Sequence, residues 1–367
     1  MKKFGFSMPT KILFGPGIVR EEGGALALGK KPFLVTGKSS ARRSGAWDDV
    51  LAVLPGGYEV FDQVENNPSV ETVRRGGRLA RAADCDYIIA IGGGSPLDAA
   101  KIIAVLAAND VDPLDLYTEG WSRRALPVAA IPTTAGTGSE VTQYAVLTIA
   151  DEETKKGLGG FDLFPRVAYL DPRYTRSQPL EVTVDTAVDA LSHLIEGYLA
   201  RRAAPASDFT ALKGLELWAE NIAALKAGSF SLENRASLLL ASTLGGITIA
   251  QTGTCLVHAL GYSLTYFHGL PHGRANAVFL AEYLRYTETV EPQRTEEILG
   301  LLGLSSPEDF GELISGLFRQ KLDNFSLSKA EKRRYVQKAV STRNMSNSRG
   351  EPGLEELMKI VEASVKS

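Results

Sequence analysis

The first half of the chain alternates short apolar, β-branched runs with stretches of helical character. Five of these runs predict buried strands that end in turn residues: 31–37, 57–62, 86–94, 126–134 and 166–172. Strands that are apolar on both faces and separated by helices are typical of a parallel sheet covered on both sides. Residues 143–160 predict a hairpin, or a strand followed by a mobile turn.

After Pro172 the pattern changes to a helical period, and no convincing strand follows. Helices are predicted over residues 184–200, 206–226, 231–250, 274–287, 292–303, 307–318, 328–341 and 353–366. Ser306, which precedes Pro307, and Ser328 are candidate N-caps. We therefore expect two domains, an α/β domain over residues 1–175 and an all-helical domain over residues 176–367. Ligand sites favour such a junction and the carboxyl ends of parallel strands.

Composition narrows the class of protein. The chain has 367 residues, 44% of them hydrophobic, and a formal net charge of −3. The sequence contains no large basic patch, so nucleic-acid binding is not expected. The cluster from Lys332 to Arg334 is interpreted as a solvated helix face. The apolar runs are too short for a membrane span, and the basic start lacks the apolar core of a signal peptide. Cys85 and Cys255 are interpreted as buried small hydrophobes in a cytoplasmic protein.

A strand, a glycine turn and a helix follow one another in the middle of the first domain. Gly92, Gly93 and Gly94 allow positive φ angles and close approach of a ligand to the backbone. Ser95 is predicted as the N-cap and Pro96 as the first helical residue. The free N–H groups and the helix dipole favour an anion there, most simply a pyrophosphate. The alternative is a plain tight turn, because the motif is neither GxGxxG nor a P-loop.

A second loop rich in glycine and hydroxyl groups follows the strand predicted near residue 130. Thr133, Thr134, Thr137 and Ser139 could bind a ribose or an amide. Such loops are common and the signal is weak alone. Two of them at the ends of neighbouring strands predict a dinucleotide cofactor.

The end of the first predicted strand bears on the choice between NAD and NADP. An acidic residue there would bind the ribose 2′-hydroxyl, whereas small and basic residues admit a 2′-phosphate. Gly37 is followed here by Lys38, Ser39, Ser40, Arg42 and Arg43. This favours NADP(H) over NAD(H), the alternative being that these are solvated loop charges.

The chain has four histidines, and three of them lie between residues 258 and 272. Asp189 and His193 lie one helical turn apart on the same face. The glycine and proline of "HGLPHG" interrupt the helix between His258 and His272, and His268 lies four residues before His272. One carboxylate and several imidazoles suit Fe²⁺ or Zn²⁺ with a position left for substrate. A metal beside a dinucleotide predicts hydride transfer to or from an alcohol carbon.

Four long motifs resemble the iron-containing, or group III, alcohol dehydrogenases. They are "GGGSPLDAAK" (92–101), "PTTAGTGSE" (132–140), "DALSHLIEGYL" (189–199) and "HALGY…PHGRANA" (258–277). The overall pattern is most similar to bacterial members described as 1,3-propanediol, lactaldehyde or butanol dehydrogenases. The resemblance implies a dehydroquinate synthase-like fold, with an N-terminal dinucleotide-binding α/β domain and a C-terminal helical metal-binding domain. It also implies hydride transfer between NAD(P) and a small primary alcohol or diol.

The resemblance implies roles for individual residues. As metal ligands it assigns Asp189, His193, His258 and His272. As cofactor-binding residues it assigns Gly93, Gly94, Ser95 and Asp98 at the pyrophosphate, Thr133 and Thr134 in the second loop, Asn67 near the adenosine, and Lys155 or Lys156 near the nicotinamide. NAD-preferring members carry Asp where this chain has Gly37, which agrees with the expectation of NADP(H).

The chain departs from the family pattern at residue 262. Many members have a histidine there, four residues after the third metal ligand, which is thought to help proton transfer. This chain has Tyr262, whose hydroxyl can also relay a proton. His268 is an alternative relay, although a surface role explains it equally well.

Two other functions are compatible with parts of the pattern. A dehydroquinate-synthase-like lyase would use NAD transiently, but it needs many basic residues around an acidic substrate and "HGLPHG" supplies few. A non-catalytic nucleotide-binding protein leaves the four metal ligands without a purpose. Small alcohols or aldehydes are the expected partners, and family habit implies a homodimer or a higher homo-oligomer.

Overall fold

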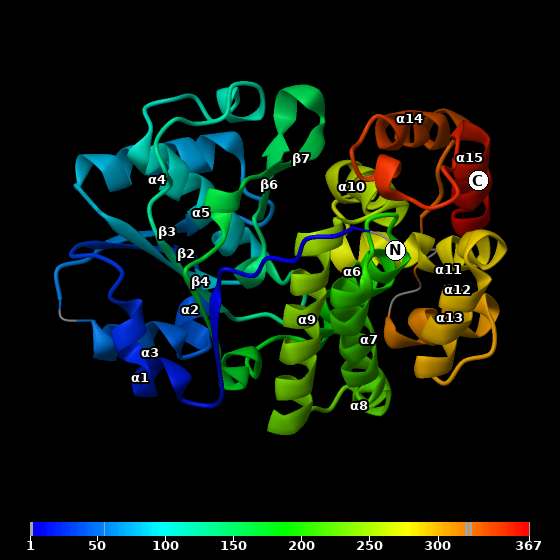
Figure 1. Ribbon diagram of the computed structural model, residues 1–367, viewed down its shortest axis with the longest axis horizontal. Helices are drawn as coiled ribbons and strands as arrows, with labels where there is room; N and C mark the ends of the chain where they lie inside the picture. Colours follow the sequence, from blue (N-terminus) through cyan, green and yellow to red (C-terminus); the bar gives the residue numbers. More distant parts are fainter. Residues whose placement is uncertain (1–2, 55, 320–321, 323–324, 367) are drawn as a thin grey trace. The chain divides into compact units, whose positions relative to one another are not determined.

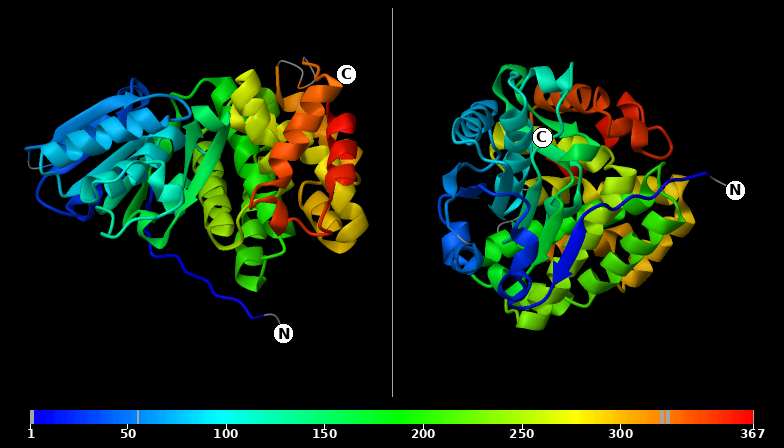
Figure 2. Two further views of the ribbon diagram at one scale, coloured as in Figure 1. Left: turned by 90° about the horizontal axis from the view of Figure 1, so that it is seen from above. Right: turned by 60° about the vertical axis from the view of Figure 1, so that its left-hand side comes forward.

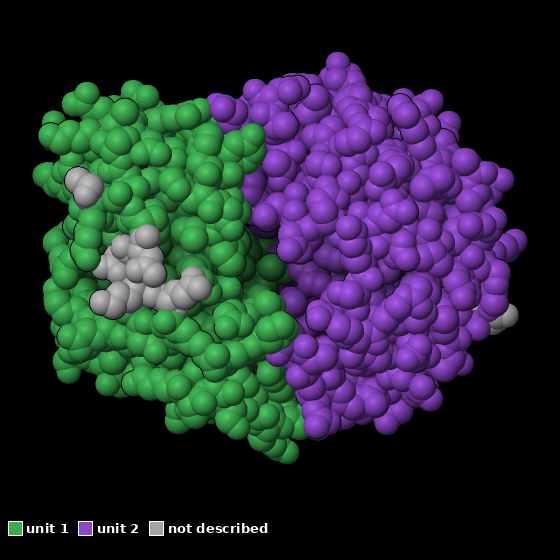
Figure 3. Space-filling model, turned by 180° about the vertical axis from the view of Figure 1, so that it is seen from behind, with its two compact units in different colours: residues 1–7, 135–137, 179–367 green, residues 8–134, 138–178 purple. Residues whose placement is uncertain are grey.

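The computed structural model describes residues 3–54, 56–319, 322 and 325–366. They form two compact units, coloured separately in Figure 3. The sheet unit comprises residues 8–134 and 138–178. The helical unit comprises residues 1–7, 135–137 and 179–367, so two short pieces of the first half of the chain belong to it. The main change of unit falls after residue 178, three residues beyond the predicted division.

The sheet unit contains a six-stranded parallel sheet. Its strands in spatial order are β1 (Lys11–Phe14), β8 (Val167–Leu170), β5 (Val128–Pro132), β4 (Tyr87–Gly92), β2 (Pro32–Gly37) and β3 (Glu59–Val64). The five predicted strands are confirmed, with shifted ends. β1 was not predicted, because it is a short edge strand whose residues Lys11 and Phe14 are exposed, so it lacks a continuous apolar run.

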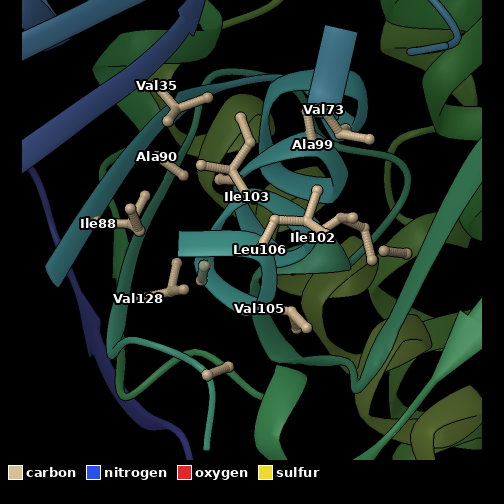
Figure 4. Close-up of a cluster of buried hydrophobic side chains, with 14 of the residues drawn as sticks. Val35, Val73, Ile88, Ala90, Ala99, Ile102, Ile103, Val105, Leu106 and Val128 are labelled. Atoms are coloured by element: carbon tan, nitrogen blue, oxygen red, sulfur yellow. The ribbon is translucent and has the colours of Figure 1, made fainter. Parts of the chain in front are cut away.

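Helices cover both faces of this sheet (Figure 1). Ile88 and Ala90 of β4 pack with α4 (Val70–Ala82) and α5 (Gly94–Ala108), as Figure 4 shows. The alternate residues Ile89 and Ile91 face the other side. That side is covered by α1 (Ile18–Glu21), α2 (Ser40–Arg43) and α3 (Ala46–Val53). Because side chains alternate along a strand, burial on both faces accounts for the unbroken apolar runs.

The segment over residues 143–160 is a hairpin. β6 (Tyr144–Ile149) and β7 (Thr154–Gly159) pair antiparallel as a separate two-stranded sheet. The hairpin alternative is therefore confirmed. The turn contains Glu153 in the left-handed region, with φ of 49°.

The helical unit is built from long helices, and its described residues form no strand of their own. The helices are α6 (Leu180–Leu199), α7 (Pro205–Ala219), α8 (Ile222–Ala227), α9 (Leu232–Thr252), α10 (Leu256–His268), α11 (His272–Val290), α12 (Pro292–Leu301), α13 (Pro307–Leu317), α14 (Lys329–Val340) and α15 (Leu354–Ser364). Figure 2 shows α14 and α15 side by side, in orange and red. This α/β unit followed by a helical unit is the predicted fold class.

Helix ends agree with local signals at some positions and not at others. Ser306 and Ser328 cap α13 and α14 by accepting hydrogen bonds from the backbone N–H of Asp309 and Glu331, as predicted. The single helix predicted over 206–226 is wrong. It divides at buried Asn221, whose Nδ2 donates to a backbone carbonyl at the end of the preceding helix.

The basic cluster on α14 is not wholly solvated, which corrects its interpretation from sequence. Lys332 is only 2% exposed, and its Nζ donates to the carbonyl of Val365 at 2.6 Å. Its aliphatic stem is buried between helices while the charged head meets the carbonyl end of α15. Cys85 and Cys255 are both buried, as predicted. Among the described residues, no single helix is long and apolar enough to cross a bilayer, although α9 and α10 together, bent by 112°, reach that length and hydropathy.

Candidate metal centre and cofactor-binding loops

Three helices of the helical unit bring the predicted metal ligands together. Asp189 and His193 lie on one face of α6, His258 lies in the first turn of α10, and His272 begins α11. The Nε2 atoms of His193 and His258 are 3.0 Å apart. Asp189 Oδ1 lies 3.9 Å from Nε2 of both His258 and His272. All except the half-buried His272 are buried.

Two glycines shape the junction of α10 and α11 and the packing of α11. Gly269, with φ of 65°, ends α10 in the left-handed conformation that glycine adopts at low cost. Gly273 lets the start of α11 touch α6, because a Cβ on Gly273 would lie 1.8 Å from the carbonyl oxygen of Asp185. That close approach places His272 beside Asp189.

Hydrogen bonds on the far side of two imidazoles orient their inner nitrogens. His193 Nδ1 lies 3.3 Å from the carbonyl oxygen of Gly136, which can only accept, so Nδ1 carries the proton. His258 Nδ1 contacts a carboxylate oxygen of Glu196. Each Nε2 then presents a lone pair, and two lone pairs facing each other at 3.0 Å repel unless a cation lies near them.

The donor set fits a divalent cation. Metal–nitrogen bonds of about 2.1 Å at tetrahedral angles put donor atoms about 3.4 Å apart. The observed separations of 3.0 Å and 3.9 Å lie on either side of that distance. Burial lowers the pKa of His193, which keeps its ring in the neutral form that binds metals.

Two buried residues beside the centre were missed by sequence reasoning. Glu196 and Asn276 are both 0% exposed. Asn276 Nδ2 donates to Asp189 Oδ1 at 3.1 Å and lies 3.2 Å from His258 Nε2. Both residues lie inside the quoted motifs, one helical turn after His193 and His272 respectively. Their polarity on a buried helix face is the signal that could have identified them.

The two candidate proton-relay residues lie in different surroundings. The ring of Tyr262 stacks on that of His272, with centroids 5.5 Å apart and planes at 14°. His268 Nε2 lies 2.9 Å from the hydroxyl of Tyr335 on α14. His268 lies about 15 Å along α10 from His258, because an α-helix rises 1.5 Å per residue. The structure therefore brings Tyr262, and not His268, to the ligand group.

In the sheet unit, the glycine loop after β4 lies against the loop after β5. Thr133 N donates to the carbonyl of Gly92 at 2.9 Å. A Cβ on Gly93 would lie 3.0 Å from Cγ2 of Thr134, so glycine permits this contact. Of the glycine triplet, Gly92 has the positive φ angle, at 155°. The two predicted cofactor loops thus form one surface at the carboxyl end of the sheet.

The prediction of Ser95 as N-cap is wrong. α5 begins at Gly94, two residues before the predicted first helical residue Pro96, and the extended residue Gly93 precedes it. The hydroxyl of Ser95 accepts a hydrogen bond from Asn67 N at 3.1 Å instead. Asn67 has φ of 55°, and its carbonyl accepts from Thr148. Ser95 and Asn67 are therefore held together, although they are distant in sequence.

Asp98 and Ser139 belong to a polar network that joins α5 to the second loop and the hairpin. Ser139 Oγ donates to Asp98 Oδ1 at 2.6 Å, and Val146 N donates to Asp98 Oδ2 at 3.0 Å. Lys101, only 1% exposed and not predicted, donates to Ser139 Oγ at 2.8 Å and to the Tyr144 carbonyl at 2.7 Å. Burial lowers the pKa of Lys101 to about 8 and raises that of Asp98.

The remaining predicted cofactor residues lie on β2 and β7 or just after β2. Gly37 ends β2, where a Cβ would lie 3.3 Å from the carbonyl oxygen of Val64. Lys38 and Arg43 are exposed after it, while Arg42 lies over the ring of Trp47 at 4.2 Å. Lys155 and Lys156 lie on β7. Nζ of Lys156 pairs with Glu152 at 3.0 Å and lies 5.0 Å from the ring of Tyr117.

A parallel sheet covered on both faces and an Asp–His group in a helical unit are the two features that the resemblance to the iron-containing alcohol dehydrogenases implies. The sequence matches the family described as "Iron-containing alcohol dehydrogenase" over residues 9–172. Residues 183–365 match "Fe-containing alcohol dehydrogenase family, C-terminal". The chain belongs to the iron-containing alcohol dehydrogenase family.

Similar proteins cover nearly the whole chain. 1,3-Propanediol dehydrogenase of Klebsiella pneumoniae is 34% identical over 335 residues, 88% of this chain and 86% of that protein. NADPH-dependent butanol dehydrogenase of Clostridium saccharobutylicum is 33% identical over 320 residues, 84% and 81% of the two chains. The crystal structure of an iron-containing alcohol dehydrogenase from Thermotoga maritima matches with a TM-score of 0.91 at 38% identity, covering 99% of each chain. A sulfoacetaldehyde reductase from Bifidobacterium kashiwanohense, solved with NAD⁺, matches with a TM-score of 0.87 at 26% identity and 99% coverage of each chain.

Proposed function

We propose that this protein is a metal-dependent, NAD(P)-linked alcohol dehydrogenase and aldehyde reductase for small primary alcohols, diols and their aldehydes. The observation that carries the proposal is the group of Asp189, His258 and His272, whose donor atoms all lie within 4.8 Å of one another. His193 adjoins this group through His258, whose Nε2 lies 3.0 Å from its own. The names of the propanediol and butanol dehydrogenases among its relatives support the substrate class.

The four side chains would hold Fe²⁺ or Zn²⁺, and the family description supports iron. When bound, such an ion polarises the substrate oxygen and stabilises the negative charge that develops on it. The protein's own task is to keep the donors unprotonated and oriented. Asn276 donates to Asp189, and Gly136 fixes the proton of His193 on the outer nitrogen.

The sheet unit would bind the dinucleotide, whose nicotinamide exchanges a hydride with the alcohol carbon. The N-terminal end of α5 offers backbone N–H groups to a pyrophosphate. We propose a preference for NADP(H) because Gly37 has no carboxylate to bind a ribose 2′-hydroxyl. The exposed Lys38 and Arg43 add positive charge near a 2′-phosphate.

The test measures the oxidation of NADPH and of NADH with propanal and butanal, using protein loaded with Fe²⁺ or with Zn²⁺. We expect turnover to require metal and kcat/KM to be higher with NADPH. Asp189→Ala and His272→Ala should lower turnover by about a thousandfold or more while dinucleotide affinity is unchanged. Full turnover after metal removal would contradict the mechanism. A failure to consume either cofactor with any aldehyde would favour transient use of NAD in a lyase.

Assembly and location follow from the family resemblance and composition alone. We propose a homodimer or higher homo-oligomer in the cytoplasm. Light scattering coupled to size-exclusion chromatography would measure the mass of the particle, and a monomer would contradict the first part of this proposal.

A further inference from the structure

Glu196 is a buried carboxylate that lies beside the proposed ligands without belonging to them. It lies on α6, one turn after His193, and is 0% exposed. Its Oε1 accepts hydrogen bonds from the backbone N–H groups of Cys255, Val257 and His258, at 2.9, 2.9 and 3.2 Å. A carboxylate taken this deep into the protein is stable only with such donors.

The three N–H groups belong to the start of α10. The first N–H groups of a helix have no partner within the helix, and the helix dipole makes that end positive. α10 begins at Leu256, so Glu196 acts as a cap supplied by another helix. The carboxylate therefore holds the first turn of α10, which carries His258, against α6.

The second carboxylate oxygen determines which nitrogen of His258 carries the proton. Oε2 of Glu196 contacts His258 Nδ1. A carboxylate oxygen only accepts, so Nδ1 donates and Nε2 keeps its lone pair. Nε2 is the atom that faces His193 Nε2, and the amide Nδ2 of Asn276 lies 3.2 Å from it.

We propose that Glu196 is a positioning residue that performs both tasks at once. Its Oε1 fixes where α10 begins, and its Oε2 holds His258 in the tautomer that offers Nε2 to a cation. The inference deepens the proposed function and rests on it for the identity of the bound group. The hydrogen bonds to Glu196 stand independently of that function.

Glu196→Gln separates the two tasks. The amide oxygen can still accept from the three backbone N–H groups, so the metal-free protein should melt within a few degrees of the wild type. The amide NH₂ would face His258 Nδ1, which must then accept, and the proton moves to Nε2. We expect Zn²⁺ affinity, measured by calorimetry, to fall about 10- to 100-fold. Glu181→Gln, which changes an exposed carboxylate on the same helix, should leave Zn²⁺ affinity unchanged.

The tautomer itself is measurable by nitrogen NMR of protein labelled in its four histidines. In the metal-free wild type we expect the His258 proton on Nδ1, and in Glu196→Gln on Nε2. A wild-type His258 protonated on Nε2 would overturn the proposal even if the variant failed to fold. Unchanged Zn²⁺ affinity in a folded Glu196→Gln protein would also overturn it. If no alcohol or aldehyde is turned over but the tautomer and Zn²⁺ affinity change as expected, the positioning role stands and the proposed reaction is wrong.

Discussion

Tyr262 shows how one residue can alter the chemistry of a shared site. It lies one turn after His258 on α10, and its ring stacks on His272 at 5.5 Å. A phenol in that place can pass a proton, as an imidazole can. The stacked ring of Tyr262 also contacts one face of the His272 imidazole.

Tyr262→Phe is expected to lower kcat about 100-fold and to change its pH dependence. The phenyl ring keeps the contact with His272, so bound metal per chain should not change. Tyr262→His restores the residue that many family members carry and should retain most of the turnover. Steady-state kinetics across pH, with metal analysis of each variant, provides the measurement. A Phe variant with the wild-type kcat and pH profile would show that the hydroxyl has no part in proton transfer.

At the scale of elements, the metal centre depends on how closely α11 approaches α6. Gly273 lies where a Cβ would be 1.8 Å from the Asp185 carbonyl oxygen and 2.9 Å from Asp189 N. Backbone atoms cannot move aside as a flexible side chain does, so the two helices must separate if a side chain is added.

Gly273→Ala should therefore lower the free energy of unfolding by about 2–4 kcal/mol and weaken Zn²⁺ binding. The matched control is Gly300→Ala on α12, where a Cβ would meet no described atom within 4 Å. That change should be neutral, or stabilising by about 0.5–1 kcal/mol, because alanine favours a helix. Urea denaturation of the metal-free variants compares them. Equal stability of the two variants would show that α6 and α11 tolerate separation.

Within the sheet unit, Lys101 ties α5 to the loop that contains Ser139. Burial lowers the pKa of this ammonium to about 8, from an ordinary value of 10.5. Between these two pH values the unfolded chain binds more protons than the folded protein, so Lys101 makes stability rise with pH there. Below pH 8 both states are protonated and this dependence disappears.

Lys101→Met removes that dependence while keeping most of the volume of the side chain. The stability of the wild type relative to the variant should increase by roughly 1–2 kcal/mol between pH 8 and pH 10. Urea unfolding at several pH values measures the difference. A difference that stays constant over this interval would mean that Lys101 titrates at its ordinary pKa, and one that falls would mean that folding raises its pKa; either would contradict the prediction.

At the scale of the whole molecule, each unit carries its own set of candidate binding residues. The proposed metal ligands lie in the helical unit, and the glycine loop, Thr133, Thr134 and Ser139 lie in the sheet unit. A ligand stabilises the part of the protein that binds it, in proportion to its affinity and concentration.

Hydrogen exchange should therefore respond to the two ligands in different segments. Removal of metal by a chelator is expected to increase exchange in the first turns of α10 and α11, and Zn²⁺ or Fe²⁺ should reverse it. NADPH should instead slow exchange at the start of α5 and in the loop after β5. Mass spectrometry of peptides measures both effects. Protection by metal confined to the sheet unit would contradict the assignment of Asp189 and the three histidines.

The sequence by itself determined five of the strands, most of the helices, the covered parallel sheet and the ligand candidates. Apolar periodicity reports burial directly, and Ser306 and Ser328 are caps whose partners lie within a few residues. The family motifs were sufficient to select Asp189 and three of the four histidines.

Only the tertiary structure decided which polar groups from distant parts of the chain form hydrogen bonds with one another. Glu196 binds the start of a helix about sixty residues further along, and Lys332 is buried against Val365. Ser95 is not a cap because α5 begins at Gly94. Such pairings depend on how closely two elements approach, and at Gly273 the absence of one Cβ permits that approach. Local pattern encodes burial, whereas the partner of a buried charge is fixed by packing between distant segments.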